Sequence, residues 1–465
     1  MNNTPVDLSP FAPVLTRADA LHLLRRATFH PSLDMVEALV GKGAPQAVAT
    51  LMALEPPVSL PSWANDPPAL TQQTGPPLWA ELQKWWIGHV LTTTSVRDLM
   101  VAFWQNHFTS DYIVVYASQW MVAQSMLFRQ HAYDYPTLSE QIVGDPAMLR
   151  YLDGNQSVKG RPNENFAREW FELFSLGVGN YTEADVLEAA RAFTGWRVMG
   201  RTAEYNRQLA DLGQKTILGQ SGPWEYNDVI RITLEQDACA RFIATKMIQT
   251  FVDYYPSDDA IAAVAYLVRR HAYNLRPVLE TLLSSNYFYA TQHRGALIKS
   301  PLQLSVGLAS LLNATAVDPA SIVQAMIQLT MTPFYPPTVQ GWKGHHNWIN
   351  SSSFPNRQRF GEAFLEGRQM GTGTRLQTTQ QTPLEIDLVS VVRRLPQYDD
   401  AEAVVAGVCE LLLPVETSQE QRDILLDVMM GGLPASYWNI DETTANSRLR
   451  QLFQTIVRMP EFQLM

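Results

Sequence analysis

The chain has 465 residues, of which 46% are hydrophobic and 17% are charged, and its formal net charge is −10. Such a length and apolar content are typical of a globular protein with a large core, whereas the acidic balance excludes a nucleic-acid groove, which needs clustered basic residues. The cysteines, Cys239 and Cys409, lie far apart in the sequence and exclude a disulfide framework or a cysteine metal site.

The N-terminal segment, residues 1–16, is polar and interrupted by proline, and it has neither the basic start nor the apolar centre of a signal peptide. The apolar helices that follow are broken by charged residues before they reach the roughly 20 residues that a membrane span needs. The sequence therefore predicts a protein outside the membrane and in the cytoplasm, or in the periplasm or secreted if a leader has been removed.

Helices are expected along most of the first third of the chain. Thr16 is a typical N-cap for the first of them, and Pro31 ends it. Proline, asparagine and glycine over 56–77 predict an ordered loop or linker. The apolar spacing predicts helices over 17–28, 32–39, 78–91, 95–108, 119–131 and 139–149.

Glycines at 177 and 179 predict a helix end, and Thr182 predicts the N-cap of a new helix that runs to Phe193. The helical period is lost over 197–224, where three glycines favour a short hairpin or an irregular excursion. Further helices are predicted over 226–254, 258–271, 276–285, 301–312 and 320–329, and then around 387–395, 401–413, 418–430 and 442–457. An aromatic loop over 332–355 and a connection rich in Thr, Gln and Gly over 371–382 separate these two groups.

These elements predict an all-α protein, with a large irregular multi-helix globular fold, long aromatic-rich loops and at most a small β-hairpin excursion. No repeat of fixed period is found, which disfavours a solenoid. We expect one large helical unit over 1–465. A subdivision into a main body, 1–370, and a C-terminal helical subdomain packed on it, 384–465, is the alternative.

The run from 163 to 175 sorts its residues onto two faces of a helix at about 100° per residue. Its apolar face holds Phe166, Ala167, Trp170, Phe171, Leu173 and Phe174, and its polar face holds Glu164, Asn165, Arg168, Glu169, Glu172 and Ser175. If the polar face lines a cleft, it can hold, protonate or orient a polar ligand. If it faces water, it is a solvated surface whose ion pairs contribute roughly 0.3–0.5 kcal/mol each.

The carboxylates of this run, Glu164, Glu169 and Glu172, are candidate catalytic groups together with Arg168. The arginine lies four residues from both Glu164 and Glu172, so it would keep nearby carboxylates ionised for work as a base or nucleophile. A desolvated carboxylate farther from Arg168 would be a better acid. Two carboxyl groups flanking a bond are typical of glycan-cleaving enzymes. The pattern therefore favours a hydrolase acting on a polar, carbohydrate-like substrate.

His107 is a further candidate catalytic residue. It shares a helical face with Phe103 and Trp104, so it is expected to be buried, either as a hydrogen-bonded core residue or as a metal ligand beside Glu169 and Glu172. No Glu-x-x-His or His-Glu-x-x-His motif occurs. No cofactor is predicted, and a metal held by His107 and the carboxylates is kept as an alternative.

Other residues are candidates for binding the substrate. Lys215 can contact an anionic group or form a structural ion pair, and Trp196 and Trp342, each beside a glycine, can stack on a sugar or fill helix ends. His345, in the aromatic loop, is also a candidate. The full set of predicted binding residues is Asn163, Asn165, Trp196, Asp211, Lys215, Trp342 and His345.

Several motifs resemble those of a large bacterial family known as domain of unknown function 1800. They span nearly the whole chain in order, and motifs this long are specific. They are LLRRATF at 23–29, FWQNHF at 103–108, MLRYLDG at 148–154, the block at 163–196, DLGQKTILG at 211–219, PPTVQGW at 336–342 and MPEF at 459–462.

The resemblance implies one mostly helical unit and little about chemistry. Members are often secreted and encoded beside a sulfatase-like family, which suggests a partner protein of that kind. This sequence departs from the family where many members have His before Asp-Pro-Gly, since it has Ala210 there. It also has His345-His346 where Gly-Gly is common.

Three hypotheses follow from the sequence. The first is a metal-independent enzyme acting on a polar, carbohydrate-like substrate by carboxylate acid/base chemistry. The second is a helical metalloenzyme that uses His107 with the carboxylates. The third is a non-catalytic binding or assembly protein whose polar helix and aromatic loop contact a partner.

Overall fold

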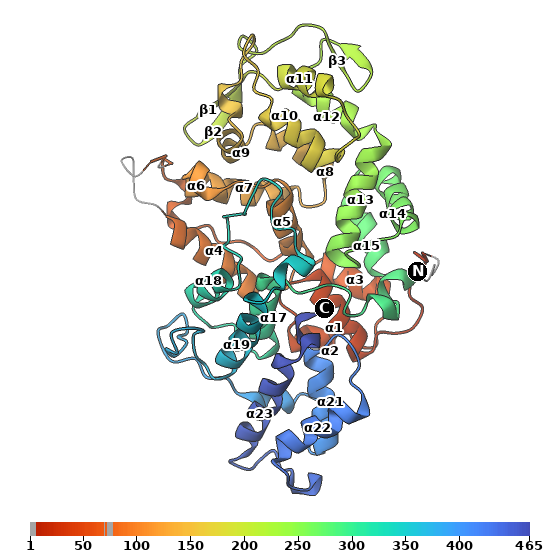
Figure 1. Ribbon diagram of the computed structural model, residues 1–465, viewed down its shortest axis with the longest axis vertical. Helices are drawn as coiled ribbons and strands as arrows, with labels where there is room; N and C mark the ends of the chain where they lie inside the picture. Colours follow the sequence, from red (N-terminus) through yellow and green to blue (C-terminus); the bar gives the residue numbers. More distant parts are fainter. Residues whose placement is uncertain (1–5, 69, 72–77) are drawn as a thin grey trace.

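The computed structural model describes residues 6–68, 70–71 and 78–465, so parts of the predicted N-terminal segment and of the 56–77 loop lie outside the described residues. The described residues form 23 α-helices and two small antiparallel sheets (Figure 1). The predicted all-α fold is confirmed. No helix in these residues is long and apolar enough to cross a membrane.

The helices predicted over 17–28, 32–39, 78–91, 95–108 and 119–131 are confirmed with small shifts of their ends. Thr16 Oγ1 accepts a hydrogen bond from the backbone N–H of Asp19, and the Asp19 carboxylate accepts one from the N–H of Thr16, which closes a capping box. The helices are α1 (Arg17–Ala27), α2 (Leu33–Leu39), α3 (Ala44–Met52), α4 (Trp79–Thr92), α5 (Val96–His107), α6 (Tyr112–Val115), α7 (Ser118–Gln130), α8 (Tyr135–Ile142) and α9 (Pro146–Tyr151).

The single helix expected over 139–149 is wrong, because the chain breaks between α8 and α9. The Asp145 carboxylate accepts from the Met148 N–H at 2.8 Å and so caps a new helix, and Pro146 fits its first position. Four helices were not predicted: α3, α6, α16 (Asn286–Tyr289) and α19 (Ser353–Leu365), the last of which begins inside the expected aromatic loop.

The middle of the chain contains a change of helix type. Helix α10 (Asn165–Glu169) continues directly as a π-helix over Trp170–Ser175. Helix α11 (Glu183–Ala192) begins at Thr182 with a second capping box, as predicted. The later helices are α12 (Tyr226–Leu234), α13 (Asp237–Phe251), α14 (Asp258–Arg270), α15 (Leu275–Leu283), α16 (Asn286–Tyr289), α17 (Pro301–Leu311), α18 (Pro319–Gln328), α20 (Leu388–Val392), α21 (Ala401–Leu412), α22 (Gln419–Met430) and α23 (Ala445–Arg458).

The loss of helical period over 197–224 corresponds to two hairpins. Strand β1 (Trp196–Met199) pairs with β2 (Thr202–Tyr205), and β3 (Lys215–Ile217) pairs with β4 (Gln220–Gly222), both antiparallel. The β3–β4 hairpin lies beside α11 and the β1–β2 hairpin beside α9 at one end of the molecule, and α21–α23 lie at the opposite end (Figure 1). A contiguous hydrophobic cluster runs from Leu15 to Phe462 and joins the body to the C-terminal helices.

The structure also shows a duplicated helical hairpin. The sequence Arg-x-His-Ala-Tyr occurs at 129–133, at the junction of α7 and α8, and again at 269–273, at the junction of α14 and α15. The two copies pair across each other: the N–H of Tyr135 donates to the Tyr273 carbonyl at 3.4 Å, and the N–H of Leu275 donates to the Tyr133 carbonyl at 2.7 Å. Helix α5 precedes and packs on the first hairpin, and α13 precedes and packs on the second.

Candidate functional site

A cavity of about 500 Å³ lies between α5 and α13. The π-helix and the segments 297–303 and 331–348 form most of the remaining wall, with further contributions from Phe29, Trp86, Met121, Gln124 and Met465. This volume lies within the range that holds a small organic molecule. Its polar and charged lining residues include Gln105, Asn106, His107, Glu172, Lys246, Gln249, Thr250 and His345, and its apolar ones include Leu99, Phe103, Leu173, Phe242, Phe334 and Trp342.

Helices α5 and α13 contribute faces with the same spacing to this cavity. On α5 the lining residues include Leu99, Phe103, Asn106 and His107; on α13 they include Phe242, Lys246, Gln249 and Thr250. Both sets follow the i, i+4, i+7, i+8 pattern of one helical face. The two helices differ at two matching places, where one has Phe103 and His107 and the other has Lys246 and Thr250. The walls that α5 and α13 contribute to the cavity therefore share a spacing but carry an asymmetric set of ionisable groups.

The π-helix determines how His107 is held. Its i to i+5 bonding sends the Leu176 N–H to the Phe171 carbonyl and leaves the Phe174 carbonyl for other donors. His107 Nε2 lies 2.9 Å from this carbonyl oxygen, and the Tyr135 hydroxyl donates to the same oxygen at 2.6 Å. Because a carbonyl only accepts, Nε2 carries the proton and Nδ1 has a free lone pair.

The Nδ1 atom of His107 is buried and has no hydrogen-bond partner among the described residues. Burial, with a smaller effect from the positive charge of Lys246, lowers the pKa of His107 to about 3. The imidazole is therefore neutral at physiological pH, and Nδ1 can accept a proton or a hydrogen bond from a ligand.

Replacing His107 by Gln is expected to flatten the dependence of stability on pH. The folded pKa of His107 lies below the ordinary value of 6.5, so between pH 6.5 and about 3 the unfolded chain binds a proton that the folded protein does not. The free energy of unfolding is therefore highest above pH 6.5 and falls as the pH drops. His107 contributes up to about 1.4 kcal/mol per pH unit to this fall. Urea unfolding of wild type and variant from pH 4.5 to 7.5 measures the difference. If the plots of unfolding free energy against pH were parallel for wild type and variant, the prediction would be contradicted. As a control, replacing the exposed His346 by Gln should leave the slope of the wild-type plot unchanged.

Lys246 is one of two lysines that line the cavity, the other being the exposed Lys343. The ammonium group of Lys246 makes no hydrogen bond or ion pair with any residue that the structure describes, and its nearest aromatic ring, that of Phe242, has its centroid 5.5 Å away. Burial lowers the pKa of this lysine. An amine without a partner in a partly buried, largely apolar wall favours an incoming anion or hydrogen-bond acceptor.

Glu172 contributes the carboxylate of the cavity wall. It lies in the π-helix, and its Oε2 accepts a hydrogen bond from the Tyr181 hydroxyl at 3.1 Å. The adjacent Glu169 is not a lining residue. Burial, followed by the charge of Glu172, raises the pKa of Glu169.

The aromatic loop closes the cavity through a side-chain clamp on its backbone. Asn106 Oδ1 accepts from the Trp342 N–H at 2.7 Å, and Asn106 Nδ2 donates to the Trp342 carbonyl at 3.1 Å. His345 Nε2 donates to the Ala296 carbonyl at 3.1 Å, and its ring stacks on Tyr254 with centroids 4.5 Å apart. The loop thus brings Trp342 and His345 into the same wall as His107.

The remaining polar residues of the 163–175 run lie outside the cavity lining. Arg168 donates to both carboxylate oxygens of Glu183 at 2.8 Å and to Glu164 at 3.3 Å, in an exposed network. Asn163 Oδ1 accepts from the Asn165 N–H at 2.8 Å in a turn before the helix. These contacts are those of a helix surface and its N-terminal turn.

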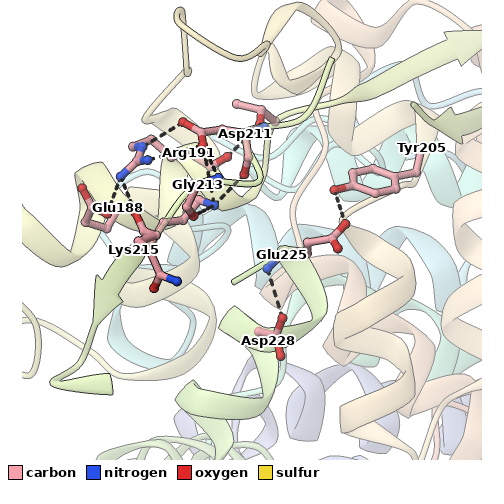
Figure 2. Close-up of polar contacts among 10 residues, drawn as sticks. Glu188, Arg191, Tyr205, Asp211, Gly213, Lys215, Glu225 and Asp228 are labelled. Atoms are coloured by element: carbon pink, nitrogen blue, oxygen red, sulfur yellow. Dashed lines mark hydrogen bonds and ion pairs between the residues drawn. The ribbon is translucent and has the colours of Figure 1, made fainter. Parts of the chain in front are cut away.

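Lys215 and Asp211 belong to a separate network between α11 and β3. Figure 2 shows Arg191 reaching Glu188 and Asp211, while Lys215 Nζ donates to the carbonyls of Asp211 at 2.5 Å and Gly213 at 3.0 Å. The Lys215 side chain is fully buried, and its Nζ is 3.9 Å from Asp211 Oδ1. Its donors are used in holding the loop before β3.

Trp196 also lies away from the cavity. Its ring packs over Gly144, where an added Cβ would come within 2.5 Å of the ring, and it contacts Tyr205 and Tyr226. Trp196 therefore fills the space between β1 and α8 rather than a ligand site.

The structure brings together four of the predicted site residues, His107, Glu172, Trp342 and His345, and places the other eight elsewhere. Sequence analysis missed Lys246, although it lies on a face whose spacing matches that of α5. The repeated Arg-x-His-Ala-Tyr motif was the available signal for this pairing. Within the described residues, no group of three or more His, Cys, Asp or Glu side chains is arranged to hold a metal ion.

The fold and the cavity define an all-α protein with a central space of small-molecule size. The chain belongs to the family described as "Protein of unknown function (DUF1800)", whose model matches residues 22–464. The resemblance drawn from the motifs is thus confirmed. No curated protein and no solved structure matches the chain.

Proposed function

We propose that the cavity between α5 and α13 is the active site of an enzyme that acts on a small organic molecule with an anionic group and an apolar body. The observation that carries this proposal is the unpaired ammonium group of Lys246 in the cavity wall. Lys246 is partly buried, and its ammonium group has no protein partner, so it can bind an incoming anion.

The other lining residues have complementary roles in this proposal. Phe103 and Phe242 contact the apolar body of the ligand, and the ammonium group of Lys246 binds its anionic group. The free Nδ1 of the neutral His107 acts as a hydrogen-bond acceptor, and Glu172 is the acid/base group. Acid/base chemistry is therefore proposed for Glu172, with His107 orienting the ligand, rather than for the carboxylates of the 163–175 run as a set.

A carbohydrate-like substrate, and hence a hydrolase, stays a proposal. The ligand screen described in the next paragraph tests whether a sugar binds. Trp342 is the lining residue that would stack on a sugar ring. A sulfatase-like partner protein is proposed on the family resemblance alone, and co-purification with such a protein would test it.

Replacing Lys246 by Met is expected to weaken binding of an anionic ligand by roughly 10- to 100-fold, which corresponds to the loss of one hydrogen bond to a charged group. Thermal shift with benzoate, phenyl phosphate, phenyl sulfate and a neutral methyl glucoside identifies the ligand class, and calorimetry then measures the affinity. A binding anion that loses affinity in the variant supports the proposal.

The matched control is replacement of the exposed Lys159, which lies outside the cavity lining, by Met. This variant should keep wild-type affinity because its ammonium group is not in the cavity wall. Equal affinity of wild type and the Lys246 variant for every anion, or binding of the neutral glucoside alone, would overturn the proposed anionic ligand.

A further inference from the structure

Three cationic side chains are buried together where the N-terminal, central and C-terminal parts of the chain meet. Arg25 of α1 is 7% exposed, Lys299, just before α17, is 8% exposed, and Arg357 of α19 is 0% exposed. The positive charges of Arg25 and Arg357 act on Lys299, and together with burial they lower its pKa. Charged groups of one sign are buried next to each other here.

The hydrogen bonds of this cluster leave several donors unused. Arg357 Nε donates to Gln463 Oε1 at 2.7 Å and Nη2 donates to the Lys299 carbonyl at 2.6 Å, but Nη1 has no partner among the described residues. Gln463 Nε2 and Arg25 Nε are also buried and have no hydrogen-bond partner among the described residues. Three N–H donors around Lys299 therefore lack an acceptor, which is rare in a native interior.

The described residues also do not balance the charge of the cluster. Glu410 is the carboxylate that acts on Arg25, whereas no carboxylate among these residues is identified as acting on Lys299 or Arg357. Lys299 Nζ donates to the Phe462 carbonyl at 2.6 Å and lies 4.2 Å from the Phe462 ring centroid, so both of its contacts are with neutral groups. Buried charges without a counter-charge are strongly disfavoured.

A small cavity adjoins these side chains. It has a volume of about 20 Å³, and its polar lining residues are Arg25, Thr28, Lys299 and Gln303, with aliphatic and aromatic groups around them. Arg357 and Gln463 do not line it, and the Nη atoms of Arg25 donate to carbonyls of α21 and its C-terminal end, so Arg25 Nε is the unpartnered donor at this cavity. A space of this size holds one water-sized particle. It is too small for phosphate, sulfate or an organic acid.

We propose that this small cavity is a binding site for a single monovalent anion of the size of chloride, held by Arg25 and Lys299. The anion accepts a hydrogen bond from Arg25 Nε, which is otherwise unpartnered, and supplies the missing negative charge beside Lys299. It links α1 to the start of α17 and, through the Lys299 carbonyl that accepts from Arg357, to α19. Its function is structural, since it joins three segments that are far apart in the sequence. The site adjoins the large cavity, with which it shares Phe29, Gln303 and Met465 in its lining, but it does not involve Lys246.

Thermal unfolding in matched series of sodium chloride, sodium bromide and sodium gluconate tests this site, starting from protein prepared without halide. Chloride and bromide should raise Tm by about 1–3 °C with saturation, whereas gluconate, which does not fit the cavity, should not at equal ionic strength. The Lys299→Met variant should lose the halide-specific rise, and the control Lys159→Met, at an exposed lysine, should keep it.

A crystal of the wild-type protein grown in sodium bromide gives a second, independent result. An anomalous bromide peak between Arg25 and Lys299 would support the site even if the Lys299 variant failed to fold. A water in that position with no bromide peak, or equal Tm responses to all three salts, would overturn the proposal.

Discussion

Replacing Arg26 by Met is expected to lower the free energy of unfolding by about 3–5 kcal/mol. The side chain is fully buried, and it donates to the carbonyls of Val252 at 2.8 Å and His293 at 2.5 Å. A further, longer bond of 3.4 Å reaches the carbonyl of Phe251, so two of the acceptors lie at the C-terminus of α13. The cation there offsets the helix dipole, and its removal leaves buried carbonyls without donors.

Guanidinium chloride unfolding of wild type and variant measures this loss. The matched control is Arg270→Met at the exposed C-terminus of α14, which should change stability by less than about 0.5 kcal/mol. Arg26→Lys should recover part of the loss, because it keeps the charge but not the forked geometry. A loss below 1 kcal/mol for Arg26→Met would show that the three carbonyls find other donors.

Replacing Gly341 by Ala is expected to destabilise the protein by about 2–4 kcal/mol and to displace the aromatic loop from the cavity. Gly341 has a φ of +73°, and an added Cβ would lie 2.3 Å from Asn106 Oδ1 and 2.6 Å from the Asn106 carbonyl oxygen. The backbone of α5 cannot move away easily, so the loop must shift. The two hydrogen bonds between Asn106 and Trp342 would then be lost.

Gly344 provides the control for backbone strain alone, because it lies in the same loop with a φ of +71° and its added Cβ would come no closer than 3.8 Å to another residue. Its ψ of −169° lies in a region that is essentially restricted to glycine, so Gly344→Ala should cost the backbone strain alone, about 1–3 kcal/mol. Thermal unfolding and tryptophan fluorescence compare the two variants. Equal losses would mean that the contact with Asn106 does not hold the loop.

Helix ends were predicted well where a local signal exists. Thr16 and Thr182 both form the capping boxes that their sequences indicate, since a cap depends on atoms within four residues. The start of α9 is marked in the sequence only by Asp145 and Pro146, which lie inside an apolar run. The prediction therefore merged α8 and α9 into one helix. Family membership was also available from the sequence, because its motifs are long and ordered.

The site was predicted in part, and the reason lies in the 163–175 run. A helical wheel at a constant angle places Arg168 and Glu172 on one face, but the helix becomes a π-helix at Trp170, so the angle per residue changes between them. Arg168 then pairs with Glu183 from the next helix, while Glu172 lines the cavity. No pattern within the run indicates where α11 will pass.

The sequence by itself determined the all-α class, most helix positions and the family, because these depend on local periodicity, caps and contiguous motifs. The tertiary structure decided which polar groups share a cavity. Lys246 and His107 are 139 positions apart (246 − 107) in the sequence, and they meet because the duplicated hairpins place α5 and α13 on either side of one space. The buried position of Lys215 was likewise decided by packing, since its ammonium group is held by the backbone of a loop whose path depends on α11.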